Sequence, residues 1–321
     1  MVLAALLSLS PSTLVITLLS VGVLTHLCYQ LLLHPLRSVP GPFVCKLNRL
    51  WLFYHSYIGD ESSQITRLHS IYGPVVRIGP YEISISDGAA LAPIYTDGGG
   101  FLKAACYKNF DIDGHPSIFS ALDPAHRAVR AKPVVSLFAP SAIRSKAKEP
   151  LEEVSKRLVA RINQAKTTYG RVNILELTRA AALDAVSGYL FGESYDGFGE
   201  AKNRNTPGLS ASGFVDTFVA VGRFFLLPTP VFMFLESTIP KLFPNPEVDK
   251  SMATVSTYVN SLVTTDKSSL EGDTYQNRML RAGITPHETA AQCMDLIFAG
   301  TDSTGMNLAT CFFHLARNST Q

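Results

Sequence analysis

Charged residues are scarce in this sequence. Only 17% of the 321 residues are charged, compared with about 25% in a typical soluble domain. The formal net charge is +2. This low and nearly balanced charge argues against a nucleic-acid partner, a coiled coil or a disordered tail, all of which are rich in charged side chains. Hydrophobic residues make up 46% of the chain, so a globular and somewhat apolar body is expected.

Cysteines are also few, and their number is odd. None of the five forms a C-x-x-C pair or a cluster with histidine at the spacing of metal ligands. This argues against a disulfide scaffold and against a zinc site. The five are Cys28, Cys45, Cys106, Cys293 and Cys311.

Charge is entirely missing from residues 1–36. The apolar run Val2–Leu33 exceeds the roughly 20 residues that cross a bilayer, and a span over Thr13–Leu33 fits best. A cleaved signal peptide is the alternative, but it would have a basic start and a cleavage site of small residues, and this segment shows neither. Because positive residues such as Arg37 and Lys46 follow the span, the positive-inside rule places the body in the cytosol and the N-terminus in a lumen.

A proline-rich connector follows the predicted anchor. Residues 34–42 (HPLRSVPGP) contain three prolines, which interrupt a helix and favour a stiff, extended spacer. We therefore divide the chain into an anchor over residues 1–36, a hinge over residues 37–50 and a body over residues 51–321.

The body is predicted to be mainly α-helical with a small β-sheet. From Val75 the sequence alternates apolar and polar residues around Gly79-Pro80, as in a β-hairpin. Apolar residues at three- and four-residue spacing predict core helices over 142–166 and 173–190. Two polar stretches, 199–213 and 265–277, are predicted to be surface loops.

An aromatic segment lies between the two predicted loops. It extends from Phe214 to Phe234 and is broken by Pro228 and Pro230. Such a segment fits core packing, a second contact with a bilayer, or a hydrophobic lid.

A long helix is predicted to begin after Thr285. Thr285 provides an N-cap hydroxyl, Pro286 takes the first helical position, and Glu288 follows the cap by three residues, which together form a capping box. Apolar residues then continue to Leu315, so the helix has about 30 residues and a length of about 45 Å. It is long enough to cross a whole domain.

The middle of this helix, residues 299–305 (AGTDSTG), is a poor helix-forming sequence. Each of its two glycines costs about 1 kcal/mol relative to alanine, and an acid stands among hydroxyl residues. Such local violations tend to mark function. The alternative is a kinked core helix whose hydroxyl groups bond back to the preceding turn.

Several segments together resemble the cytochrome P450 family. Residues 299–304 (AGTDST) are similar to its central-helix signature, [AG]-G-x-[DE]-T-[TS], and residues 126–130 (HRAVR) are similar to its W-x-x-x-R helix. Residues 72–80 and 119–124 resemble microsomal fungal members that act in secondary metabolism. The anchor, hinge and hairpin occur in the same order as in the family, so the resemblance implies the N-terminal part of that fold.

The resemblance implies haem as cofactor, held by a cysteine thiolate that activates dioxygen. It also implies an NADPH-dependent reductase as partner, a lipophilic substrate such as a terpenoid or polyketide, and the endoplasmic reticulum membrane as location. By the same resemblance, Arg130 and His126 pair with a haem propionate. These two residues are four apart on one helix face.

The remaining roles that the resemblance implies belong to the central helix. Asp302 relays protons from solvent, while Ser303, followed by Thr304, provides the hydroxyl that binds the activated oxygen. Ala299 and Gly300 leave room for oxygen and for the porphyrin face.

The sequence departs from the family pattern after the central helix. The family then has an E-x-x-R helix and a loop F-x-x-G-x-R-x-C-x-G with the cysteine ligand, and neither is matched here. The one E-x-x-R string, residues 176–179, precedes the central helix, and we interpret it as a coincidence on a core helix. None of the five cysteines has a ligand-like surrounding sequence.

Three hypotheses follow from this departure. The first is a catalytically inactive, incomplete P450 domain that does not hold haem stably, in which no residue serves as metal ligand. The second is an N-terminal fragment of an active haem-thiolate monooxygenase that hydroxylates a lipophilic substrate. The third is a non-catalytic, membrane-anchored binding or scaffold protein.

Overall fold

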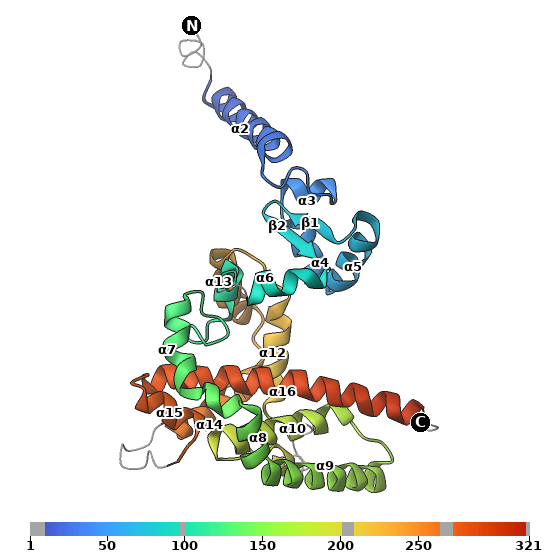
Figure 1. Ribbon diagram of the computed structural model, residues 1–321, viewed down its shortest axis with the longest axis vertical. Coiled ribbons are helices and arrows are strands. Elements are labelled where there is room, and N and C mark those ends of the chain that lie inside the picture. Colours follow the sequence, from blue (N-terminus) through green and yellow to red (C-terminus); the bar gives the residue numbers. More distant parts are fainter. Residues whose placement is uncertain (1–9, 97–99, 201–208, 264–271, 319–321) are drawn as a thin grey trace. The chain divides into compact units, whose positions relative to one another are not determined.

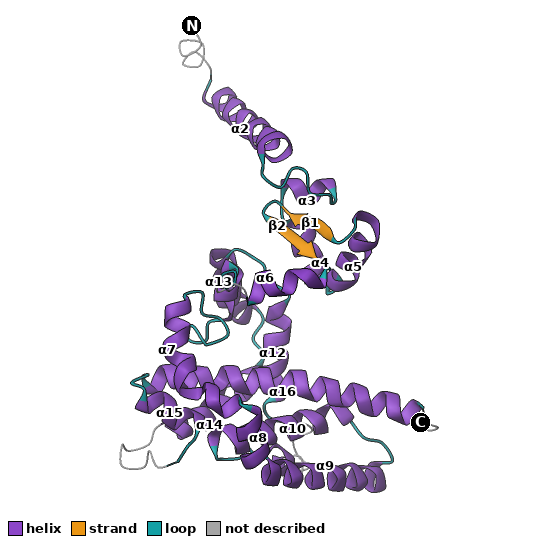
Figure 2. Ribbon diagram, viewed as in Figure 1, coloured by secondary structure: helices purple, strands orange, loops and turns teal. Residues whose placement is uncertain are grey.

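The computed structural model describes residues 10–96, 100–200, 209–263 and 272–318, and it is mainly helical. The chain forms two compact units, Met1–Phe101 and Leu102–Gln321. Their boundary lies inside the segment that the sequence analysis treats as one body. Within the described residues, both named β-strands belong to the first unit (Figures 1 and 2).

The first unit begins with an apolar helix. Ser10 caps this helix, since its hydroxyl accepts a hydrogen bond from the Thr13 amide at 3.3 Å. The helical stretch Pro11–Leu33 has a mean hydropathy of 1.8 and is long and apolar enough to cross a bilayer. The helical elements of the unit are α2 (Pro11–Cys28), the π-helical turn η1 (Tyr29–Leu33), α3 (Phe43–Leu47), α4 (Leu50–Ile58), α5 (Glu61–Tyr72), the 3₁₀ turn η2 (Gly88–Ala90) and α6 (Leu91–Tyr95).

The predicted β-hairpin is confirmed. Strands β1 (Val75–Gly79) and β2 (Glu82–Ile85) pair antiparallel, with Val75 opposite Ile85. The tight connection at Pro80-Tyr81 joins them, as the Gly-Pro pair predicts.

The connector after the apolar helix is not the extended spacer that its prolines predicted. Residues 35–38 form turns in which the Arg37 amide donates to the carbonyl oxygen of His34 at 3.0 Å. The Leu36 amide donates to Nδ1 of His34 at 3.0 Å. Proline forbids a continued helix, but it also suits a turn, and the imidazole of His34 stabilises that turn.

A buried arginine ties this connector to the hairpin. Arg77 is fully buried in β1, and its guanidinium donates to Oε1 of Gln30 at 2.8 Å and to the carbonyl oxygen of Pro80 at 2.7 Å. Further bonds reach the carbonyl oxygen of Leu36 at 3.2 Å and Nδ1 of His34 at 3.2 Å. Burial lowers the pKa of Arg77, and burial together with the charge of Arg77 lowers the pKa of His34.

Among its described residues the second unit is mainly helical, and it has an isolated bridge between Ile112 and His115. Its first helical elements are η4 (Ala105–Phe110), α7 (Pro124–Val134), η5 (Val135–Phe138), α8 (Pro140–Lys146), α9 (Lys148–Tyr169), α10 (Ile174–Val186), the π-helical turn η6 (Ser187–Phe191) and α11 (Gly197–Glu200). They are followed by α12 (Ser212–Gly222), α13 (Thr229–Leu242), α14 (Pro246–Val263), α15 (Tyr275–Arg281) and α16 (Pro286–Arg317).

The predicted helix over 142–166 is interrupted. It is divided at Ala147 into α8 and α9, because Pro150 has no amide hydrogen for the helical bond at this point. The helix predicted over 173–190 is found as α10 and η6, and the side chain of Asn173 caps it. Of the two predicted loops, residues 201–208 and 265–271 lie outside the described residues.

The aromatic segment is divided between the core and the surface. Phe214 in α12 is fully buried and Phe232 in α13 is 4% exposed, as core packing requires. Met233 and Phe234, also in α13, are 58% and 65% exposed. The segment therefore has both a core side and an apolar outer side.

Helix α16 is the central element of the second unit. It extends through the unit alongside α10, α12 and α14, as Figure 1 shows in red. Its N-terminal half is buried, with Cys293 and Ile297 fully inside the core. Beyond Gly305 its apolar side chains become exposed, including Phe313 and Leu315.

Candidate functional site

The central helix has the predicted start and length. The hydroxyl of Thr285 accepts a hydrogen bond from the Glu288 amide at 3.2 Å, and the helix then continues for 32 residues to Arg317. No helical residue is lost at the two glycines. The helix is continuous through Gly300 and Gly305, where a neighbouring helix supports it.

This support comes from α10, which crosses α16 at very short range. A Cβ atom at Gly300 would lie 2.6 Å from Cγ2 of Val186, and one at Gly305 would lie 2.8 Å from Cγ of Arg179. The hydroxyl of Thr178 donates to the carbonyl oxygen of Gly305 at 2.9 Å. The glycines are therefore needed for close helix packing.

This packing corrects one expectation. Gly300 was expected to leave room for oxygen and a porphyrin, but the side chain of Val186 fills the space beside it. The open side of the helix lies elsewhere. Ala299, Ser303 and Thr304 are exposed, and Ala299 and Ser303 share a face because they are four residues apart.

The hydroxyl groups of this segment have different partners. Ser303 Oγ donates to the carbonyl oxygen of Ala299 at 2.7 Å, which is the back-bonding expected of a helical serine. Thr301 is fully buried, and its hydroxyl has no hydrogen-bond partner among the described residues. Ser303 and Thr304 thus have the exposed hydroxyl groups of this segment, and Ser303 shares its face with Ala299.

Asp302 is held by an arginine from α10. Oδ1 of Asp302 accepts a hydrogen bond from Nη2 of Arg179 at 2.7 Å, and Nη1 of Arg179 donates to Oδ1 of Asp216 on α12 at 2.9 Å. The Arg179 side chain is 7% exposed. Burial lowers the pKa of this guanidinium, but the hydrogen bonds to the two carboxylates more than compensate and raise the pKa of Arg179 above its usual value.

Arg179 belongs to the E-x-x-R string that the sequence analysis interpreted as a coincidence. That interpretation missed its contact with a predicted site residue. One signal was available, since an arginine among the apolar residues of a core helix needs a charged partner.

The predicted basic pair on α7 meets an acid from the start of α16. Arg130 binds Glu288 through both guanidinium edge nitrogens, with Nε at 2.5 Å from Oε1 and Nη2 at 3.1 Å from Oε2. Nε2 of His126 lies 3.9 Å from Oε1 of Glu288 and is buried without a hydrogen-bond partner. The Glu288 side chain therefore serves α7, and only the amide of Glu288 contributes to the predicted capping box.

A second acid lies one turn before Ala299. Burial raises the pKa of Asp295 to about 6, while a hydrogen bond from Ser117 and the charge of Lys103 act in the opposite direction. Asp295, Ala299 and Ser303 follow one another at four-residue spacing, so they lie along one face of α16.

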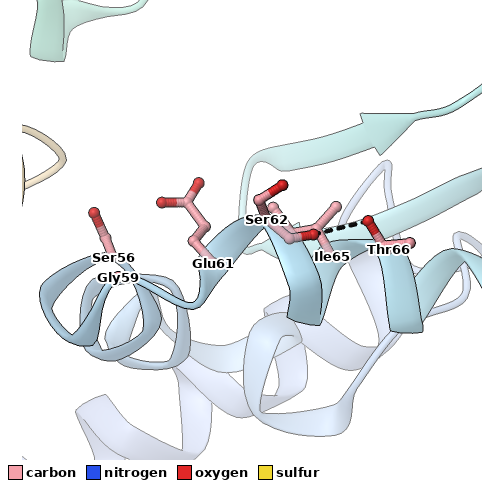
Figure 3. A pocket seen from close by; sticks show the side chains of 6 residues that line it. All are labelled: Ser56, Gly59, Glu61, Ser62, Ile65 and Thr66. Atoms are coloured by element: carbon pink, nitrogen blue, oxygen red, sulfur yellow. Dashed lines mark hydrogen bonds between the residues drawn. The ribbon is translucent and has the colours of Figure 1, made fainter. Parts of the chain in front are cut away.

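The first unit contains an open groove that holds none of the predicted residues. It lies between α4 and α5, and Figure 3 shows its hydroxyl groups and one acid, Glu61. The hydroxyl of Thr66 is already bonded to the carbonyl oxygen of Ser62 at 2.8 Å. Glu61 is the one acid among the residues that line the groove. A single acid without a base or a second acid beside it does not make a catalytic site, so we assign no catalytic role to the groove.

Comparison with known protein families decides the identity of the chain. Residues 39–320 match the family model for cytochrome P450. The chain belongs to the cytochrome P450 family. Its helical second unit, with a long central helix beside α10, α12 and α14, is consistent with that fold.

Several fungal P450 proteins are similar to this chain. A cytochrome P450 monooxygenase from Annulohypoxylon moriforme, mfmF, is 36% identical over 311 residues, which cover 92% of this chain and 63% of the relative. Tryprostatin B 6-hydroxylase from Neosartorya fischeri is 28% identical over 225 residues, which cover 69% of this chain and 39% of the relative. The chain spans less than two thirds of the length of each of these relatives.

The P450 family implies haem, and part of the described chain fits this group. A guanidinium and an unpaired imidazole nitrogen at Arg130 and His126 form a donor set that suits a propionate carboxylate. Ser303 and Ala299 offer a small, exposed helix face. Two of the described cysteines, Cys293 and Cys45, are poorly suited to the axial position. Cys293 is fully buried, and burial raises the pKa of this thiol; burial likewise raises the pKa of Cys45 to about 11.

Proposed function

We propose that this chain is the oxygen-activating part of a haem-thiolate monooxygenase of fungal secondary metabolism. The arrangement on α16 carries the proposal. Ser303 and Ala299 share an exposed face, and Asp302 next to them is ion-paired with Arg179. An acid and a hydroxyl at successive positions of one helix supply two groups that can each hold or transfer a proton.

Haem, when bound, supplies the oxygen chemistry. The Ser303 hydroxyl donates to the Ala299 carbonyl oxygen in the structure, and a rotamer change turns it toward a ligand on the exposed face. Asp302 has a side chain that is 23% exposed, so it can exchange protons with water while Arg179 holds it in place. Thr304 is exposed beside Ser303 and offers a further hydroxyl.

Arg130 and His126 would hold a haem propionate in this proposal. Both lie on α7, and both already face a carboxylate, that of Glu288. Charge-assisted bonds from arginine to a carboxylate are among the strongest polar contacts in proteins.

We further propose that residues 1–321 expressed by themselves are catalytically inactive and hold haem only weakly. Neither Cys293, which is inaccessible, nor Cys45, which belongs to the other compact unit, is suited to be an axial thiolate. An active enzyme would then need the family's cysteine loop in addition to these residues.

Membrane attachment, a reductase partner and a lipophilic substrate complete the proposal. The apolar helix over Pro11–Leu33 supports a single-pass anchor with the N-terminus in the lumen of the endoplasmic reticulum, followed by a hinge over residues 37–50. The exposed Met233 and Phe234 support a lipophilic substrate route or a second bilayer contact at α13.

A reduced carbon monoxide difference spectrum tests the proposal. We would record it on microsomes that carry the 321-residue chain and on microsomes that carry the same chain extended through any coding sequence that follows. The expected result is a thiolate-type Soret band from the extended chain alone. A band from the 321-residue chain would overturn the inactivity, and no band from either would overturn the haem-thiolate function.

Two variants of the band-forming chain then test the roles on α16. Asp302→Asn should lower product formation by at least about 100-fold, and Ser303→Ala should divert reducing equivalents to hydrogen peroxide. Thr310→Ala is the matched control, because its hydroxyl also bonds back along α16, to the carbonyl oxygen of Met306 at 2.8 Å. If all three variants behave alike, the assigned roles are wrong.

A further inference from the structure

The side chain of Glu288 does not make the hydrogen bond that an acid at this position of a capping box usually makes, to the backbone at the start of the helix. The amide of Glu288 is capped by Thr285, but its carboxylate turns to α7 and binds Arg130. The Glu288 side chain is 9% exposed, so this ion pair is well shielded from water.

Arg130 keeps unused hydrogen-bonding capacity in this arrangement. Of the five N–H donors of a guanidinium, Nε and one donor of Nη2 bind Glu288, and one donor of Nη1 reaches the carbonyl oxygen of His126 at 3.3 Å. Two donors of Arg130 are therefore left. The buried Nε2 of His126 is a further polar atom without a partner.

We propose that Glu288 is a positioning residue that fixes Arg130 so that its remaining donors, together with His126, bind a second carboxylate, the propionate of haem. This inference rests on the proposed function. By holding one edge of the guanidinium, Glu288 removes rotamer freedom from Arg130 before the ligand arrives. It also balances the positive charge of Arg130 in a poorly solvated place.

The alternative role for the Glu288 carboxylate is to compete with the propionate for Arg130. A carboxylate that merely filled the site would compete with the propionate, and its removal would strengthen binding. A positioning carboxylate weakens binding when it is removed. The two roles therefore predict opposite signs.

The test compares haemin with haemin dimethyl ester as probes. Both have the same ring and iron, but only haemin has free propionates. The 321-residue chain in detergent micelles is titrated with each probe by absorbance, and the ratio of the two dissociation constants is recorded. Because this ratio measures recognition of a carboxylate, it does not require an axial thiolate, and general loss of folding affects both probes equally.

The wild-type chain should prefer haemin by at least about tenfold, the size of one or two charged hydrogen bonds. Glu288→Gln should reduce this preference to about threefold or less while the dissociation constant of the ester stays the same. Arg130→Lys should reduce it similarly, and the double variant should show no additional loss, since the two residues act together. Glu288→Asp should recover part of the preference.

The control is Glu153→Gln on α9, an exposed acid in the same unit, which should keep the wild-type ratio. An unchanged or increased ratio in Glu288→Gln would overturn the positioning role and leave the proposed function intact. If the wild-type chain fails to bind haemin, or binds both probes equally, the propionate contact of the proposed function fails and the inference fails with it.

Discussion

Each of the two compact units contains a buried arginine, and the two guanidinium groups are stabilised by different partners. In the first unit, Arg77 is surrounded by neutral acceptors, namely carbonyl oxygens, the amide of Gln30 and the imidazole of His34. In the second unit, Arg179 has two carboxylates, Asp302 and Asp216. Both side chains are at most 7% exposed.

The difference separates an arginine that ties backbone segments together from one that is paired with a predicted site residue, Asp302. Neutral acceptors satisfy the donors of Arg77 but leave its charge without a counter-charge. The role that these contacts support is structural, since they join the connector after the apolar helix to the hairpin. The carboxylates of Arg179 belong to helices α16 and α12, and one of them is the predicted proton carrier. A change at Arg179 therefore alters the charge state of the site, whereas a change at Arg77 alters the fold.

The largest effect is expected from Arg77→Ala. It leaves several buried acceptors without donors, so the free energy of unfolding of the first unit should fall by about 4 kcal/mol. The only tryptophan, Trp51 in α4, reports on this unit by fluorescence during urea unfolding. Arg67→Ala on the exposed side of α5 is the control and should change stability by less than about 0.5 kcal/mol. Equal effects of the two variants would contradict the structural role of Arg77.

Arg179→Ala should lower the stability of the second unit by about 3 kcal/mol, because Asp302 and Asp216 lose the charged hydrogen bonds that the buried guanidinium donates to them. Circular dichroism during denaturation measures this loss, and Trp51 fluorescence should stay unchanged. In a double-mutant cycle, Arg179 and Asp302 should show a coupling of about 2 kcal/mol. A coupling near zero would mean that the ion pair does not form in solution.

Asp295, a partly buried acid without an arginine partner, should make the stability of the second unit depend on pH. Its folded-state pKa of about 6 lies above the usual value of 3.8, so the unfolded state releases this proton more readily. Stability from this group is fully present below about pH 4 and is lost as the pH rises through about 6, by about 3 kcal/mol in total. Asp295→Asn should remove that loss, as unfolding at pH 4.5 and 7.5 would reveal. Identical pH profiles of variant and wild type would disprove the shift.

The smallest effects on stability are expected at Gly305 and Gly300, which pack against Arg179 and Val186 of α10. Gly305→Ala should destabilise the second unit by about 1 kcal/mol, because the new methyl group meets the backbone of Arg179 and outweighs the gain in helix propensity. Gly300→Ala would place its methyl group 2.6 Å from Cγ2 of Val186, a stiff β-branched side chain, so it should destabilise the unit by a similar amount, and Val186→Ala should relieve that loss. A stabilising Gly305→Ala would show that the helices lie further apart.

Most of the helical framework could be predicted from the sequence. Capping at Thr285 and Asn173 and alternation around Gly79-Pro80 are local signals, and local signals determine where helices and the hairpin begin. The prediction was wrong at Pro150, where a single proline divided a helix, and in residues 35–38, where prolines made a turn.

Less of the site could be predicted, because its contacts join distant segments. Arg179 and Asp302 are 123 residues apart, and Arg130 and Glu288 are 158 apart. A motif names the residues of one helix but gives no information on the helix that packs against it. The role of Gly300 was misjudged for the same reason, since only the crossing with α10 shows what fills the space beside it.

The joint at Arg77 also has a mechanical consequence. Gln30 and His34, at the end of the apolar helix, are hydrogen-bonded to the guanidinium of Arg77 in the hairpin. The helix and the hairpin are therefore expected to move as one rigid piece. A flexible tether would let a bilayer-bound helix swivel freely, whereas this joint passes any tilt of the helix directly into the sheet.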